Sequence, residues 1–130
     1  MPRRASKHPT DLELEVLQVL WDAGPLSGQA IRDALEPTRT LTYQAVMTVL
    51  GIMEDKGYVA RKKSSGRFEY RARVSKPTTA KRMLRDLVNR LFDGSAATAM
   101  INLLESSDLT TDELNELRTE INRNDKKGQR

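Results

Sequence analysis

The 130-residue sequence predicts a mainly α-helical chain with one small β-hairpin, in the form of a winged helix-turn-helix domain followed by a C-terminal helical region. Apolar residues recur at helical spacing in most segments. Between residues 58 and 74 they instead alternate with charged residues on both sides of a Ser-Ser-Gly sequence, which indicates a hairpin. Three helices followed by a hairpin is the element order of a winged helix, which predicts that fold for the first part of the chain.

The first predicted helix follows a polar, basic arm at residues 1–9, which we expect to be flexible. Thr10 and Glu13 fit a capping box, in which the hydroxyl and the carboxylate each bond an otherwise unpaired backbone N–H. Gly24 lies where this helix ends. Ser27 is expected to cap a short second helix, and a short turn then leads to the third.

The third predicted helix has two different faces. It extends from the N-cap Thr42 to Lys56, and Gly57 supplies a left-handed C-cap. The apolar face carries Val46, Val49, Leu50 and Met53, and the opposite face carries Gln44, Met47, Thr48, Gly51 and Asp55. A helix face that meets only solvent is usually rich in Lys and Glu, so this second face favours contact with a groove of a partner.

Positive charge is concentrated around the hairpin. The whole chain has 22 Lys and Arg residues against 18 Asp and Glu residues, a net charge of +4. Residues 56–73 contain seven of the basic residues and only one acidic residue, Glu69. A basic segment on a nearly neutral body is typical of nucleic-acid binding. The alternative is a solvated charged hairpin without a partner.

The C-terminal part of the chain predicts three further helices. Ser75 and Pro77 fit the cap and first turn of a helix that Gly94 terminates, and a short helix follows at about 96–104. Thr110, with a glutamate three residues later, begins the last helix with a second capping box.

These C-terminal helices carry narrow apolar seams. The seam residues are Leu84, Leu87, Val88, Leu91, Leu114, Leu117 and Ile121. A segment this short has little to pack against within one chain, so we expect two copies to bury the seams together in a homodimer. An apolar core within one chain is the alternative.

The composition excludes several classes of function. The chain has no cysteine and a single histidine, His8, which excludes a catalytic thiol and a thiolate or multi-histidine metal site. We find no nucleophile–base pair and no phosphate-binding glycine loop, so we expect no enzymatic activity and no cofactor. No apolar run approaches the roughly 20 residues that span a bilayer and no signal peptide is evident, so we expect a cytoplasmic protein.

Several stretches resemble the penicillinase and methicillin-resistance repressor family. They are DLELEVLQVLW at 11–21, LTYQAVMTVL at 41–50 and EDKGYV at 54–59, and the similarity continues through NLLE at 102–105 and LTTDEL at 109–114. The resemblance covers about residues 10–123. It implies a homodimeric repressor whose winged helix binds a palindromic operator in double-stranded DNA and whose C-terminal helices dimerise.

The resemblance also implies roles for individual residues. It implies operator contacts at the start of the third helix, at Thr42, Tyr43, Gln44, Met47 and Thr48, and phosphate contacts on the hairpin at Lys62, Lys63 and Arg67. Family members under the control of a membrane sensor protease are cut at a bond that aligns with Asn102–Leu103, although Leu103 replaces the usual aromatic residue. The alternatives are a helical asparagine without a role in proteolysis, with control by a small-molecule effector or constitutive repression.

The expected organisation is a flexible arm at 1–9, a DNA-binding domain at 10–75, a dimerisation region at 76–123 and a frayed tail at 124–130. Two alternatives remain open at this point. A winged helix used as a protein-interaction module would not need a basic hairpin, and a nonspecific DNA-binding protein would bind random duplexes as tightly as an operator.

Overall fold

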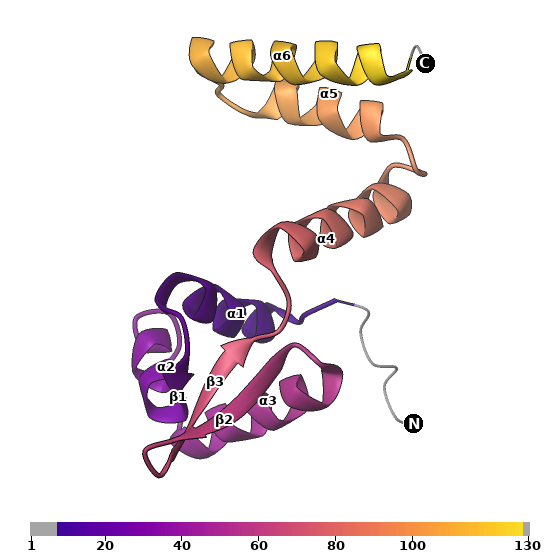
Figure 1. The fold of residues 1–130 in the computed structure, drawn as a ribbon. Coiled ribbons are helices and arrows are strands. Elements are labelled where there is room, and N and C mark those ends of the chain that lie inside the picture. The colour runs from indigo at the N-terminus through magenta and orange to yellow at the C-terminus, as the bar shows by residue number, and fades with distance from the viewer. Residues whose placement is uncertain (1–7, 129–130) are drawn as a thin grey trace. The chain divides into compact units, whose positions relative to one another are not determined.

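The computed structural model describes residues 8–128 and divides into two units, with the boundary between Leu84 and Arg85 (Figure 1). The elements are α1 (Asp11–Ala23), β1 (Leu26–Ser27), α2 (Gly28–Leu35), α3 (Tyr43–Lys56), β2 (Val59–Ser64), β3 (Arg67–Ala72), α4 (Lys76–Leu91), α5 (Ala96–Ser106) and α6 (Thr111–Gly128). The boundary falls within α4 and so lies later than residue 75, where the sequence predicts it. Residues 1–7 of the predicted arm are outside the described range.

The first unit is a winged helix, as predicted. Figure 1 shows α1, α2 and α3 grouped against the hairpin of β2 and β3. Thr10 and Glu13 form the predicted capping box. The side chains of Ser27 and Thr42 each accept a hydrogen bond from the backbone N–H three residues later, at 3.1 and 3.0 Å. Gly57 ends α3 in the left-handed region, with φ of 82°.

The sheet has three antiparallel strands in the order β1-β3-β2. The hairpin register runs from Val59 opposite Ala72 to Ser64 opposite Arg67, which leaves a two-residue turn. Its residues, Ser65 and Gly66, have φ of 50° and 81°, the combination that matches the twist of a hairpin. Strand β1 is absent from the sequence prediction, because two residues are too few to show alternation.

The hydrophobic core of this unit is built by α1, α2, α3 and the base of the hairpin. Its buried residues are Val16, Leu17, Leu20, Ile31, Leu35, Val46, Leu50, Met53, Val59 and Tyr70. The Trp21 indole N–H donates a 2.9 Å hydrogen bond to the Val74 carbonyl and so holds the end of α1 against the chain that leaves β3. The apolar face of α3 is thus buried, and its opposite face is left exposed.

A partly buried ion pair joins the start of α1 to the end of α3. The Lys56 ammonium lies 3.1 and 2.9 Å from the two carboxylate oxygens of Glu13, which is itself buried. The same carboxylate accepts a 2.9 Å hydrogen bond from the Thr10 backbone N–H. Glu13 therefore completes the helix cap and neutralises Lys56.

Replacing Glu13 by alanine is expected to lower the free energy of unfolding by about 2 kcal/mol, because charge-assisted hydrogen bonds are lost and Lys56 remains without its partner. Urea denaturation measures this change. Glu15→Ala is the matched control, since the pair of Glu15 with Arg39 is more exposed than the pair of Glu13 with Lys56 and is expected to contribute less than about 1 kcal/mol. Equal losses for the two variants would contradict a special role for Glu13.

The second unit consists of helices without a core of their own. No residue from Arg85 to Gly128 is buried in the single chain, so the intrachain core that the sequence left open is not formed. The predicted seam residues Leu84, Leu87, Leu91, Leu114, Leu117 and Ile121 are exposed, and Val88 is half-buried. Helix α5 adds four further exposed apolar side chains, Met100, Ile101, Leu103 and Leu104.

Helix α6 starts with the predicted capping box. The Thr110 hydroxyl accepts from the Glu113 N–H at 3.1 Å, and the Glu113 carboxylate accepts from the Thr110 N–H at 3.0 Å. This backbone hydrogen bond lowers the pKa of Glu113. The helix continues to Gly128, and residues 129–130 lie outside the described range. Within residues 8–128 no helix has the length and apolar character that crossing a membrane requires.

Candidate nucleic-acid interface

The exposed face of α3 is the first part of the site. The five residues that sequence analysis assigned to operator contacts, Thr42, Tyr43, Gln44, Met47 and Thr48, lie at its N-cap and in its first two turns, and of these only Met47 is half-buried. The Thr48 hydroxyl donates a 3.0 Å hydrogen bond to the Gln44 carbonyl, which leaves the methyl group of Thr48 for a partner. The Thr42 hydroxyl caps the helix, so the groups left for hydrogen bonding here are the Gln44 amide and the exposed Tyr43 hydroxyl.

The hairpin, here called the wing, presents cations on both faces. Side chains of a strand point alternately to opposite faces, and the β2–β3 register then places Lys63 on the face that also carries Tyr70. Lys62 and Arg67 lie on the other face. All three cations are exposed, and among the described residues none of them forms an ion pair. The predicted wing cations are therefore available to a polyanion.

Two cations of the basic segment are instead used within the chain. Lys56 pairs with Glu13, as described above, and Arg61 lies 3.4 Å from the carboxylate of Glu54. The Arg61 guanidinium also stacks on the Phe68 ring, 4.6 Å from its centroid. Arg61 thus links the wing to the end of α3, and the charge available for a partner is smaller than the sequence count implies.

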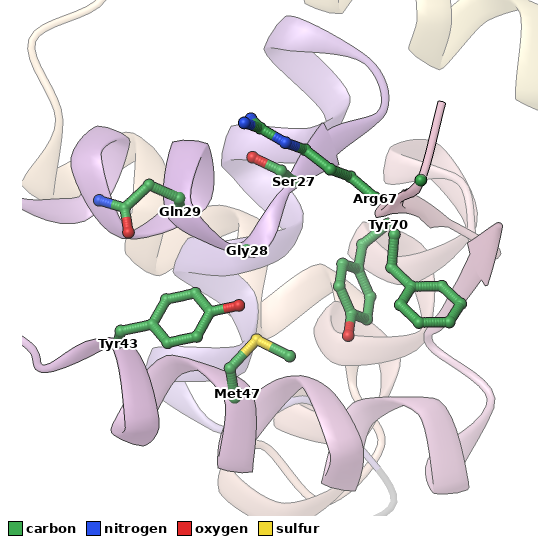
Figure 2. Close-up of a pocket in the computed structure, with 9 residues that line it drawn as sticks. Ser27, Gly28, Gln29, Tyr43, Met47, Arg67 and Tyr70 are labelled. Carbon is green, nitrogen blue, oxygen red and sulfur yellow. The ribbon is translucent and has the colours of Figure 1, made fainter. Parts of the chain in front are cut away.

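A cleft of about 440 Å³ lies between α3, the N-terminus of α2 and the wing tip (Figure 2). It is lined by Ser27, Gly28, Gln29, Tyr43, Met47, Gly66, Arg67, Phe68 and Tyr70. In Figure 2 the Met47 side chain rises from α3 toward Gly28, and the Arg67 side chain extends toward Ser27. A Cβ on Gly28 would lie 2.8 Å from the Met47 sulfur, so glycine at this position is what lets Met47 pack beneath α2.

The cleft combines an apolar floor with a cationic edge. Burial raises the pKa of the Tyr70 phenol, and the charge of Arg61 partly offsets that effect. Tyr70 therefore stays neutral at physiological pH, and Arg67 is the cation of the cleft. Apolar rings next to a guanidinium suit a sugar–phosphate strand, which has an apolar sugar and an anionic phosphate.

Sequence analysis did not predict Gln29, Phe68 or Tyr70 as part of the site. Gln29 is on α2 and the two aromatic residues are on β3, and only the pairing of β1 with β3 brings these elements together. The period-two alternation of the hairpin does indicate that Phe68 and Tyr70 share a face. No local pattern indicates that this face meets the start of α2.

The chain matches one family model and several known proteins. A family model described as the penicillinase repressor matches residues 9–123. The methicillin resistance regulatory protein MecI of Mammaliicoccus sciuri is 25% identical over 111 residues, which cover 85% of this chain and 90% of that protein. The penicillinase repressor of Bacillus licheniformis is 27% identical over 108 residues, which cover 83% and 84%. A solved structure, an ArsR-like transcriptional regulator from Rhodococcus sp. RHA1, matches with a TM-score of 0.42 and 18% identity over 77% of this chain and 86% of that chain.

Proposed function

Because the chain belongs to the penicillinase repressor family, we propose that it is a DNA-binding transcriptional repressor, acting in the cytoplasm as a homodimer on a palindromic operator. The observation that carries this proposal is that Lys62, Lys63 and Arg67 on the wing form no ion pair within residues 8–128 and lie beside the polar, exposed face of α3. A two-fold dimer presents two such surfaces, and a palindromic operator presents two matching half-sites.

In this proposal α3 reads the sequence from the major groove. The Gln44 amide pairs with N6 and N7 of an adenine, and the methyl group of Thr48 or the side chain of Met47 contacts a thymine methyl. The hydrogen bond from the Thr48 hydroxyl to the Gln44 carbonyl supports this assignment, since it leaves an apolar surface next to an amide.

The wing supplies affinity rather than sequence discrimination. Lys62, Lys63 and Arg67 contact phosphates, which are the same in every sequence. Because these cations lie on two faces of the hairpin, the wing can meet phosphates on both sides of the groove that it enters. The phosphate strand between the two grooves then fits the cleft that Arg67 and Tyr43 line.

Two alanine variants test this division. Gln44→Ala is expected to weaken binding to an operator by about 1–3 kcal/mol and to change binding to a random duplex little. Lys63→Ala is expected to weaken both equally and to reduce the dependence of the binding constant on salt concentration. The operator is obtained by selection of duplexes from a random library, and fluorescence anisotropy measures the binding constants.

Lys127→Ala on α6 is the matched control, because it removes one positive charge far along the chain from the wing. If the Gln44 and Lys63 variants lose affinity in the same way for both DNAs, the assignment of sequence discrimination to α3 and of phosphate contacts to the wing is wrong. If the wild-type protein binds every duplex equally, the chain is a nonspecific DNA-binding protein. If it binds none, the protein-interaction module is the better description.

We further propose that cleavage of the Asn102–Leu103 bond by a membrane sensor protease relieves repression. The bond lies in α5 at exposed residues. The Asn102 side-chain amide donates to the Thr98 carbonyl at 2.9 Å, and the Asn102 carbonyl accepts from the Ser106 hydroxyl at 2.8 Å. A protease needs an extended substrate, so α5 has to unwind locally before the cut. In the single chain α5 has no buried residue that would oppose this opening.

A further inference from the structure

Gly51 stands in the middle of α3, at an exposed position where nothing within the chain requires a glycine. Its φ is not positive, and a Cβ built on it meets no heavy atom within 4 Å. The other glycines of the first unit each have a reason within the chain. Gly24, Gly57 and Gly66 have positive φ, and Gly28 makes room for a methionine sulfur.

This glycine makes α3 less stable than it need be. In the interior of a helix, glycine is less favourable than alanine by about 1 kcal/mol, because it loses more backbone freedom on folding. A methyl group at Gly51 would point into open space, so alanine would carry no compensating steric penalty. Any benefit of Gly51 must therefore come from a molecule outside the chain.

The position of Gly51 indicates which molecule this is. At 100° per residue, Gly51 lies on the same face of α3 as Gln44 and Thr48, seven and three residues before it. One turn later the same face carries the exposed carboxylate of Asp55, which DNA phosphates would repel. Gly51 is thus the last position of this face before its acidic end.

We propose that Gly51 determines affinity and specificity in operator binding, because its missing side chain lets α3 lie directly against the base edges of the major groove. The inference rests on the proposed function and adds a residue to it. Gln44 and Thr48 then reach the bases because the backbone one turn later comes close to the groove floor. A side chain at position 51 holds the helix away from the DNA.

The test uses the full chain with Gly51→Ala and Gly51→Leu, which have similarly high helix propensity and different bulk. Both variants are expected to raise the melting temperature by a few degrees. Both are expected to bind the operator more weakly, by about tenfold for alanine and more for leucine, since a side chain forced into a filled contact costs about 1–3 kcal/mol. Binding to a random duplex is expected to change less than about twofold, because a loosely bound helix does not reach the groove floor.

Thr119→Ala on α6 is the control, since Thr119 is exposed on the side of that helix away from Leu117 and its substitution also raises helix propensity. It is expected to raise the melting temperature without a change in operator binding. The inference is overturned if Gly51→Ala leaves the operator affinity unchanged. It is also overturned if Gly51→Ala lowers the affinity for the random duplex as much as the affinity for the operator. A lower melting temperature also overturns it, because the glycine would then have a role in folding. A wild-type protein that prefers no duplex would instead reject the proposed function.

Discussion

Replacing Leu87 and Leu91 together by aspartate is expected to convert the proposed dimer into monomers. In one chain the two leucines are 44% and 66% exposed, so the chain itself tolerates a carboxylate at either position. In a dimer that buries the seam, each unpaired carboxylate costs on the order of 3–5 kcal/mol, and the two copies contain four of them. Analytical ultracentrifugation at micromolar concentration measures the change.

The affinity of the double variant for the operator is expected to decrease, because the variant no longer dimerises. Asn89→Asp is the matched control, because Asn89 is exposed on the same helix, away from Leu87 and Leu91, and the substitution also adds a carboxylate. Circular dichroism is expected to remain that of a folded chain, since the first unit does not use these leucines. If the double variant sediments as a dimer, the seam on α4 does not hold the two copies together.

Ending the chain after Asn102 is expected to lower operator affinity by about 100-fold or more. The shortened chain loses the seam residues Leu114, Leu117 and Ile121 and keeps only the seam of α4. The second winged helix binds its half-site at a high effective concentration only while the dimer holds it near, and the loss of that tether removes the gain in affinity. The DNA-contacting surface itself does not change.

A chain ending after Asn124 is the control, because it keeps the whole seam and loses only the C-terminal residues. Sedimentation and operator binding are measured on both shortened chains and on the full chain. If the chain ending at Asn102 dimerises and binds the operator as tightly as the full chain, cleavage at this bond is not the switch.

The sequence predicts the parts of the fold that depend on neighbouring residues. The caps at Thr10, Ser27 and Thr42 are read correctly, because each requires only one side chain and a backbone N–H three residues away. The hairpin turn at Ser65 and Gly66 is equally local. In each case the physical cause lies within one helical turn or one strand reversal.

Features that depend on distant residues escape sequence analysis. Lys56 was counted with the basic segment, yet Glu13, 43 positions earlier, neutralises it. The cleft at the wing depends on the pairing of β1 with β3, which no periodic pattern in the sequence predicts. The exposed apolar residues of α5 were also not assigned to the seam, because a helix that is apolar on several sides shows no single stripe.

The absence of any buried residue from Arg85 to Gly128 has a consequence for the amount of protein. In the proposed dimer these helices receive their hydrophobic stabilisation from a second copy, so their free energy of folding contains a term in protein concentration. When the protein is diluted, the dimer dissociates and the C-terminal helices become less ordered at the same time. A partly unfolded chain is a better substrate for degradation. Mass action would thus determine how steeply repression decreases as the protein concentration falls.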